Sequence, residues 1–380
     1  MIQKQYQKIL DRFVRDGQCA GCAVLLYKDG KELAYAASGV REFGLPDGAE
    51  NAFSRKTVML MYSMTKVVTS AAVMTLFDKG LLTPETAVCE VIPEFADLRV
   101  VSPDGSLRKA ENVLRVKHLL TMTSGIPYQW EDGPVGDEIR AMLADMETLP
   151  PEKITTLELV RRIGKCPVMF EPGTGYLYGL SADVLGGIVT VLTGMELRDY
   201  MKKTFFEPLG MTDTAFRVLP HMQSRLARKY NRDENGNFTP SDIYMGVPAI
   251  DRSPVIDMGG SGLYSTLDDF MKFGEMLRLG GMGIIREETV REMTKNQLPE
   301  CISEDYICHN GGRGYGYLVS SLADPSLDWS GDGIGTFGWG GMAGTELRMD
   351  PARGYTMVWG VQRFPGCCPL GELLEVLKEA

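Results

Sequence analysis

The most apolar stretch of the chain, residues 58–77, is interrupted by one lysine, Lys66. Apolar residues at positions 67, 68, 71, 74, 76 and 77 follow a helical period, and Gly80 supplies a stop signal. Apolar residues lie on both sides of Lys66, which indicates a buried helix rather than a solvated one. The stretch is too polar for a membrane span. The rest of the chain is therefore expected to fold around this helix.

Ser63 and Lys66 lie three residues apart, so they share one face of the predicted helix. Ser63 is near the helix N-terminus, where free N–H groups and the helix dipole favour negative charge. Burial disfavours an ammonium, so the pKa of Lys66 is expected to fall, and a neutral amine could take the serine proton. A Ser-x-x-Lys pattern also occurs by chance on solvated helices. The apolar flanks favour a nucleophile and its base.

Length and charge limit the classes of function. A chain of 380 residues can bury a large core, and two lobes are expected. Its net charge of -10, with no basic stripe, disfavours nucleic acid and anionic membranes as partners. Residues 1–14 read as an amphipathic helix with charges throughout, so we expect no secretory signal and a cytoplasmic protein.

The eight cysteines and three histidines predict no metal site. Cys19 and Cys22 have redox-like spacing, but they lead into a predicted strand and are interpreted as buried small residues. The cysteines are expected to be reduced thiols. The histidines are scattered along the chain, so neither a metal nor another cofactor is expected.

Predicted strands cluster at the two ends of the chain, and predicted helices fill the middle. A sheet built from both termini is therefore expected, with a helical insertion between them. We predict a sheet domain at residues 1–58 and 259–380, a helical domain at residues 59–258, and an active site at their seam. The predicted strands are Ala23–Tyr27, Glu32–Ser38, Gly314–Ser320, Gly344–Met349 and Tyr355–Gln362, and the clearest other helices are Val116–Met122, Leu180–Leu192, Leu267–Leu279 and Leu370–Lys378.

Three motifs occur in a fixed order: Ser63-x-x-Lys66, Tyr178 after the Pro-Gly turn at 171–175, and the glycine-rich run at 338–345. Together they resemble the serine β-lactamase and penicillin-binding-protein superfamily, in particular its class C-like branch and the family VIII carboxylesterases. Further landmarks in family order lie at residues 116–126, 170–173, 208–214 and 262–266, so the resemblance spans nearly the whole chain. It implies an α+β fold, with an antiparallel sheet flanked by helices and a mostly helical lobe.

The resemblance assigns a role to the second motif. Tyr178 would shuttle protons with Lys66. Tyr176 is the rival two residues earlier, but the register of residues 183–186 favours Tyr178. Leu180 stands where β-lactamases carry the asparagine that binds a substrate amide, so the resemblance places it among the substrate-binding residues, and amide-bearing substrates would lose a contact.

The third motif looks like the Trp-Gly-Gly version found in the esterases. Trp339 would replace the cation that receives the carboxylate of a β-lactam or peptide. Gly340 and Gly341 would let the strand backbone approach the substrate. By resemblance, the oxyanion hole consists of the backbone N–H groups of Ser63 and Met342.

The resulting expectation is a serine hydrolase that cleaves small or medium acyl esters through an acyl-enzyme on Ser63. Three alternatives stay open: a β-lactamase or D-Ala-D-Ala carboxypeptidase, an acyltransferase that uses the same residues, and a non-catalytic binding protein. Leu180 and Trp339 speak against the first, and the retained serine, lysine and tyrosine speak against the last. The expected partner is a small-molecule ester, and the sequence carries no signal for an oligomeric state.

Overall fold

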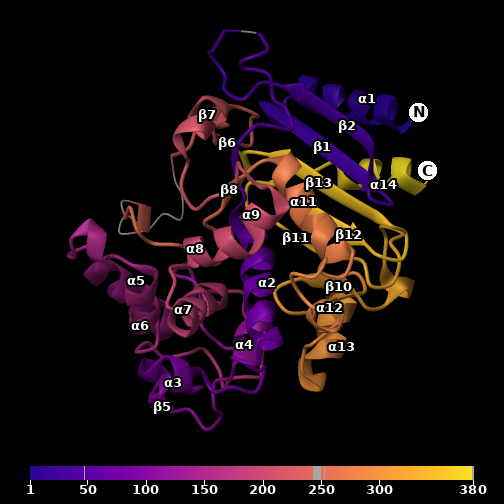
Figure 1. Ribbon diagram of the computed structural model, residues 1–380. Helices are drawn as coiled ribbons and strands as arrows, with labels where there is room; N and C mark the ends of the chain where they lie inside the picture. Colours follow the sequence, from indigo (N-terminus) through magenta and orange to yellow (C-terminus); the bar gives the residue numbers. More distant parts are fainter. Residues whose placement is uncertain (47, 243–249, 252, 379–380) are drawn as a thin grey trace.

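The two ends of the chain meet in one antiparallel sheet of seven strands (Figure 1). The computed structural model describes residues 1–46, 48–242, 250–251 and 253–378. The strand order is β2-β1-β13-β12-β11-β10-β9, so the N-terminal hairpin joins the C-terminal strands through the pairing of β1 with β13. The strands are β1 (Gly21–Lys28), β2 (Lys31–Gly39), β9 (Arg313–Tyr315), β10 (Ser320–Leu322), β11 (Phe337–Gly340), β12 (Glu346–Asp350) and β13 (Tyr355–Val361).

The N-terminal hairpin forms as its sequence predicts. Asp29 and Gly30 make the turn in left-handed conformations, with φ of 49° and 77°, which suits a tight two-residue hairpin. Residues 21–26 of β1 are buried because helices cover both faces of the sheet. Helices α1 (Ile2–Arg15) and α14 (Leu370–Lys378) cover one face, and α11 (Leu267–Arg278) covers the other (Figure 1).

The predicted buried helix is confirmed as α2 (Thr65–Asp78), which begins directly after a 3₁₀ turn, η1 (Tyr62–Met64). Every residue from Thr65 to Leu76 is buried. The helix is apolar around most of its circumference, so it needs protein on all sides, and it occupies the centre of the molecule (Figure 1).

Shorter helices pack around α2, most of them on the side away from the sheet, and short strands form three small additional sheets among the described residues (Figure 1). Residues 243–249 and 252 of the predicted helical domain lie outside the described residues. The helices are α3 (Val88–Val91), α4 (Val116–Leu120), α5 (Pro134–Met146), α6 (Thr156–Ile163), α7 (Ser181–Thr193), α8 (Leu197–Met201) and α9 (Glu207–Leu209), with α12 (Glu287–Thr294) and α13 (Glu300–His309) nearer the sheet. The short strands pair as β3 (Met59–Leu60) with β8 (Tyr264–Ser265), β4 (Arg99–Val101) with β5 (Leu107–Lys109), and β6 (Tyr230–Arg232) with β7 (Phe238–Pro240) and β14 (Arg363–Phe364).

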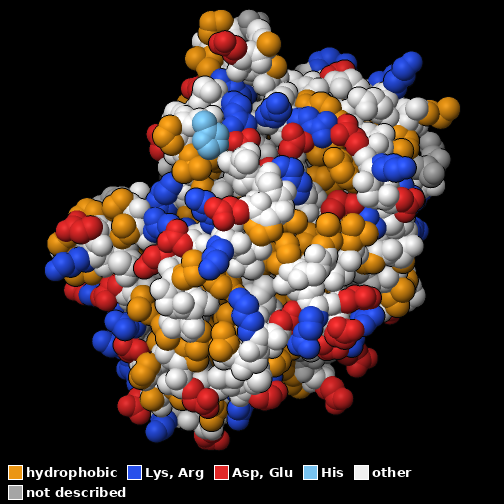
Figure 2. Space-filling view, in the orientation of Figure 1, with side chains coloured by type: hydrophobic (Ala, Val, Ile, Leu, Met, Phe, Trp, Pro, Cys, Tyr) orange, Lys and Arg blue, Asp and Glu red, His pale blue; other side chains and the backbone are white. Residues whose placement is uncertain are grey.

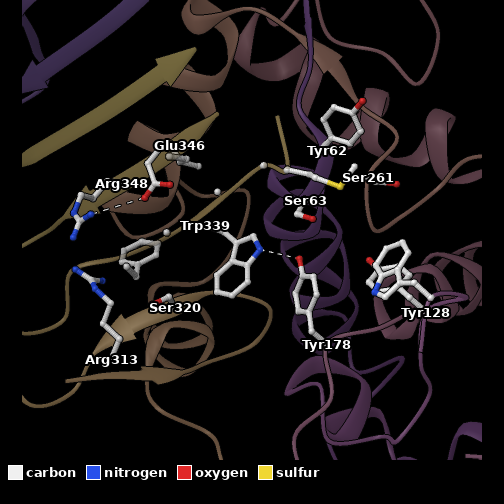
Figure 3. Close-up of a pocket in the computed structure, with 17 residues that line it drawn as sticks. Tyr62, Ser63, Tyr128, Tyr178, Ser261, Arg313, Ser320, Trp339, Glu346 and Arg348 are labelled. Atoms are coloured by element: carbon white, nitrogen blue, oxygen red, sulfur yellow. Dashed lines mark hydrogen bonds and ion pairs between the residues drawn. The ribbon is translucent and has the colours of Figure 1, made fainter. Parts of the chain in front are cut away.

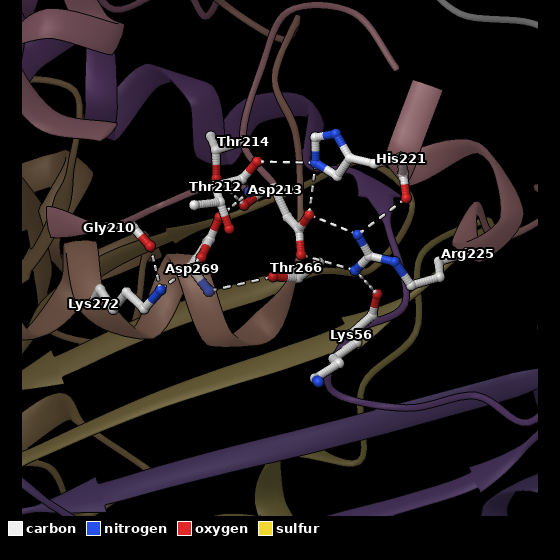
Figure 4. Close-up of polar contacts among 11 residues, drawn as sticks. Lys56, Gly210, Thr212, Asp213, Thr214, His221, Arg225, Thr266, Asp269 and Lys272 are labelled. Carbon is white, nitrogen blue, oxygen red and sulfur yellow. Dashed lines mark hydrogen bonds and ion pairs between the residues drawn. The ribbon is translucent and has the colours of Figure 1, made fainter. Parts of the chain in front are cut away.

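A polar network ties the segment after α9 to α11 (Figure 4). Asp269 of α11 accepts hydrogen bonds from the Asp213 backbone N–H at 2.7 Å and from the Thr214 hydroxyl at 3.0 Å. The Asp213 carboxylate in turn pairs with both terminal nitrogens of Arg225, at 2.6 and 2.8 Å. The Arg225 hydrogen bonds lower the pKa of Asp213.

On the face shown in Figure 2, acidic and basic side chains are interspersed.

One predicted strand is wrong. Residues 314–320 do not form a continuous strand but two short ones, β9 and β10, joined by a turn. The Gly316 N–H donates to the Val319 carbonyl at 2.8 Å, and Leu318 adopts a left-handed conformation with φ of 58°. The run of alternating apolar residues hid this turn because its left-handed residue is a leucine, not a glycine.

Candidate active site

A cavity of about 480 Å³ lies between the start of α2 and strand β11 (Figure 3). Ser63, Tyr178, Trp339, Gly340 and Met342 all line it, so the structure brings together residues that are far apart in sequence. Leu180 does not: it is buried in the core at the N-terminus of α7 and forms no part of the cavity wall. The structure therefore does not place Leu180, a predicted substrate-binding residue, in the wall of this cavity.

Ser63 stands at the tip of the central helix. The preceding residue, Tyr62, has a left-handed backbone with φ of 46°, which is uncommon for a bulky residue and is often found at functional sites. The Met64 N–H donates to the Met61 carbonyl at 3.2 Å and closes the turn. This turn presents Ser63 to the cavity, while the helix that follows stays in the core.

Lys66 is fully buried, and its ammonium has three hydrogen-bond acceptors. The Nζ atom donates to Ser63 Oγ at 3.2 Å, to Tyr128 Oη at 3.0 Å and to the Gly260 carbonyl at 2.8 Å. An ammonium has three N–H groups, so the set satisfies all of them. Burial lowers the pKa of Lys66, but Tyr128 and Tyr178 raise it, and the net shift is upward. The expectation of a lowered pKa is thus wrong, because these oxygens stabilise the charged form.

Tyr178 lies beside Lys66 and is held from the opposite side by Trp339. The Trp339 Nε1–H donates to Tyr178 Oη at 2.9 Å (Figure 3), and Lys66 Nζ is 4.6 Å from the centre of the Tyr178 ring. The rival Tyr176 does not line the cavity and instead contacts the rings of Tyr306 and Tyr315. The structure therefore places Tyr178, not Tyr176, at the site.

Tyr128 is a site residue that the sequence analysis missed. Its hydroxyl accepts the hydrogen bond from Lys66, and its side chain lines the cavity. Burial raises the pKa of Tyr128, which keeps the phenol protonated. Tyr128 lies on a loop whose sequence has no periodic pattern. The only sequence signal for a role at the site was its position two residues after the landmark at residues 116–126.

The strand that faces Ser63 fits closely against the η1 turn. A Cβ atom at Gly341 would lie 2.4 Å from the Met61 carbonyl oxygen and 2.2 Å from Thr345 Oγ1, so only glycine fits there. The Gly341 N–H donates to the Thr345 carbonyl at 2.7 Å. Among the described residues, the backbone N–H groups of Ser63 and Met342 donate to no backbone carbonyl. Ser63 and Met342 both line the cavity.

The end of the cavity beyond Trp339 is charged. Arg313, Glu346 and Arg348 line it (Figure 3). Arg348 Nε donates to Asp332 at 2.9 Å and lies near Glu346, with 3.9 Å between Nη1 and the carboxylate. Burial raises the pKa of Glu346. The cavity therefore has an aromatic part near Ser63 and a polar part farther away.

A buried carboxylate lies beneath the site. Asp183 Oδ1 accepts a hydrogen bond from the Gly260 N–H at 2.9 Å, and the Gly260 carbonyl is the acceptor for Lys66. One residue, Gly260, therefore connects the carboxylate to the ammonium, through its N–H on one side and its carbonyl on the other. Burial raises the pKa of Asp183 to about 6, against the lowering effect of Lys66.

The described part of the chain contains no group of three or more His, Cys, Asp or Glu side chains placed to hold a metal ion. None of its helices combines the length and the apolar character needed to cross a membrane.

Known proteins resemble this chain over most of its length. Esterase EstB of Burkholderia gladioli is 27% identical over 372 residues, covering 92% of this chain and 88% of that protein. Lovastatin esterase of Penicillium rubens is 26% identical over 334 residues, covering 84% and 80%. The solved structure of EstCE1, described as a hydrolase with promiscuous acyltransferase activity, superimposes with a TM-score of 0.83 at 22% identity, covering 99% of this chain and 98% of that one.

These similarities confirm the fold expected from the motifs, an antiparallel sheet with flanking helices and a helical lobe. The model of the Beta-lactamase family matches residues 6–367, almost the entire chain. The resemblance drawn from the three motifs is thus confirmed, and the chain belongs to the Beta-lactamase family.

Proposed function

We propose that this protein hydrolyses small or medium acyl esters through an acyl-enzyme on Ser63. One observation carries the proposal: the buried Lys66 ammonium lies 3.2 Å from Ser63 Oγ and next to Tyr178, beside a cavity that Ser63, Tyr178 and Met342 line. The backbone N–H groups of Ser63 and Met342 are the proposed oxyanion donors. Nucleophile, proton carrier and oxyanion donors are then all present. Relatives described as esterases support the choice of ester over amide.

The hydrogen bonds of Lys66 decide which group takes the serine proton. Its three N–H groups all have acceptors, so the charged lysine is a donor and not the base. Its positive charge and the indole N–H of Trp339 both stabilise negative charge on the Tyr178 oxygen. Tyr178 therefore acts as the base, a change from the shared role given to lysine and tyrosine in the sequence interpretation.

Acylation and deacylation then follow in two steps. Ser63 Oγ gives its proton to Tyr178 and attacks the ester carbonyl, and the N–H groups of Ser63 and Met342 bind the oxyanion. Tyr178 passes the proton to the departing alcohol as the C–O bond breaks. Water next attacks the acyl-enzyme, gives a proton to Tyr178, and releases the acid as Ser63 regains its proton.

One residue of the cavity, Trp339, speaks against β-lactam and peptide substrates. The indole N–H of Trp339 is already engaged with Tyr178, so this residue offers no donor to a substrate carboxylate. An acyltransferase remains the second candidate, because an alcohol in place of water would complete the same cycle. We also propose that the sheet domain (1–58 and 259–380) and the helical domain (59–258) meet at this cavity, since each supplies residues to its wall.

The test is hydrolysis of p-nitrophenyl butyrate, with the acyl-enzyme detected by mass spectrometry. Ser63→Ala should abolish turnover and acylation, and Tyr178→Phe should reduce turnover by at least about 100-fold, the scale of general base catalysis. Tyr176→Phe is the matched control, because Tyr176 lies outside the cavity, and it should keep near wild-type activity. Wild-type rates in Ser63→Ala would overturn the mechanism. If the wild-type protein does not hydrolyse the ester, turnover of a chromogenic cephalosporin would instead support a β-lactamase, and transfer of an acyl group to an added alcohol would support the acyltransferase.

A further inference from the structure

Trp130 lines the cavity of Ser63 and yet is 53% exposed. Its ring stacks on Tyr128 at a centroid distance of 4.2 Å and an interplanar angle of 26°. One face of a large aromatic side chain is thus supported by protein while much of the residue remains open. Exposed apolar surface in the wall of a cavity indicates contact with a ligand.

The loop that carries Trp130 is held in place by helix α5. Arg140 of α5 donates from Nη1 to the Gln129 carbonyl at 2.7 Å and to the Glu131 carbonyl at 2.9 Å, the two residues that flank Trp130. A Cβ atom at Gly136 of the same helix would lie 1.9 Å from the Glu131 carbonyl oxygen, so helix and loop are in direct contact. Because the loop is fixed in advance, binding to Trp130 costs little ordering entropy.

Trp130 is the outermost member of a row of four aromatic rings along the cavity. Centroid distances are 4.2 Å from Trp130 to Tyr128, 5.9 Å from Tyr128 to Tyr178, and 5.6 Å from Tyr178 to Trp339. All four residues line the cavity. Planar rings prefer offset-stacked or edge-to-face contact with other planar rings at such separations. The row connects the exposed tryptophan with the tyrosine beside the nucleophile.

We propose that Trp130 is a substrate-binding residue that stacks on an aryl ring carried by the substrate. The inference rests on the proposed function for the ester itself, and adds its class: esters with a planar apolar group within reach of Ser63. The ring can belong to the acyl portion or to the alcohol portion, and both present the same chemistry to the tryptophan. Tyr128 supports the tryptophan from behind while it holds Lys66.

The experiment compares matched esters in a pH-stat. Ethyl phenylacetate carries the ring on the acyl side and benzyl acetate on the alcohol side, and their cyclohexyl analogues have similar size without planarity. Trp130→Ala should lower kcat/KM for an aryl ester about tenfold more than for its cyclohexyl analogue, equivalent to about 1.4 kcal/mol of ring stacking. The ester with the larger loss identifies the side that carries the ring. Trp130→Phe should recover most of the loss.

Two controls keep the outcome specific. Trp329→Ala removes another exposed tryptophan, 63% exposed and outside the cavity, and should change no ratio. Trp130→Leu stays apolar without a flat ring and serves if the alanine variant does not fold. Equal losses for aryl and cyclohexyl esters, or no loss at all, would overturn the proposal.

A binding measurement separates this inference from the proposed function. Titration of the Ser63→Ala variant with ethyl phenylacetate, followed by calorimetry, needs no turnover. Binding that weakens about tenfold when Trp130→Ala is added supports the aryl site even if the wild-type protein hydrolyses no ester. Absence of binding, or binding that ignores Trp130, overturns it.

Discussion

Replacing Tyr128 with phenylalanine tests the arrangement around Lys66 most directly. The change deletes one oxygen and leaves the ring that stacks on Trp130. Lys66 is 0% exposed, so no solvent reaches the N–H group that loses its acceptor. A hydrogen bond to a charged group contributes about 1.5–3 kcal/mol, and a buried donor without a partner carries the full desolvation cost. Tyr128→Phe should therefore lower the free energy of unfolding by about 1.5–3 kcal/mol.

Activity should fall as well, because the ammonium that stabilises charge on Tyr178 is held less firmly. The same free energy, if expressed in the transition state, corresponds to a loss of roughly 10- to 100-fold in kcat/KM. Urea denaturation and hydrolysis of p-nitrophenyl butyrate measure the two quantities on the same samples.

The matched control is Tyr200→Phe. The Tyr200 hydroxyl also accepts a hydrogen bond from a lysine, Lys79, at 2.8 Å, and lies 2.6 Å from Thr75 Oγ1, but it does not line the cavity. It should lose stability and keep wild-type kcat/KM. If Tyr128→Phe retains wild-type activity and stability, Lys66 does not depend on three acceptors, and the assignment of Tyr178 as the base loses its support.

Three further predictions concern fit and charge. Gly341→Ala should lower kcat/KM at least about tenfold, because overpacking of about 1–3 kcal/mol would push β11 away from the nucleophile. The control is Gly371→Ala, whose added methyl stays 3.7 Å from its nearest neighbour and which should keep full activity. Equal kcat/KM values for the two variants would contradict this prediction. Burial raises the pKa of Asp183 from 3.8 to about 6, so its contribution to stability is complete below pH 3.8 and is lost as the pH rises towards 6. When both proteins are unfolded in urea, the free energy of unfolding of Asp183→Asn should therefore rise relative to that of the wild type by up to about 3 kcal/mol between pH 4 and 6. A difference between the two proteins that does not change with pH would refute the reasoning. The Arg225 hydrogen bonds lower the pKa of Asp213, so that carboxylate stabilises the fold above its unfolded pKa of 3.8 and stops doing so as the pH falls through its folded value. Asp213→Asn should be less stable than the wild type at pH 7 but not at pH 2, and a difference that persists in acid would contradict this.

Local sequence patterns were sufficient for the central helix and the N-terminal hairpin. The apolar period of α2 and the Asp29-Gly30 turn are signals that neighbouring residues carry by themselves. The split between β9 and β10 was not predictable in this way, because the left-handed residue, Leu318, gives no turn signal. The order of the strands in the sheet was not predictable either, because it depends on pairing between strands that are far apart in the sequence.

The active site shows the same difference between features set by neighbouring residues and features set by distant contacts. Ser63 and Lys66 are one helical turn apart, so their proximity followed from spacing alone. The upward pKa shift of Lys66 depends on Tyr128 and Tyr178, two side chains that reach the lysine only in the folded protein. Burial alone argued for the opposite sign, since desolvation is the one effect that an apolar flank can predict.

The pairing of β1 with β13 has a consequence for how the chain is made. Cys22 faces Val361 across the sheet, and the Tyr6 hydroxyl of α1 donates to the Leu373 carbonyl of α14 at 3.2 Å, so both ends of the polypeptide are needed to complete the sheet and cover it. During synthesis the hairpin of β1 and β2 leaves the ribosome long before β13, and one edge of β1 waits without its partner until residues 355–361 have emerged. Closing so long a loop is slow, and an unpaired strand is open to wrong partners. Production of this protein is therefore most vulnerable between the emergence of the hairpin and the emergence of β13.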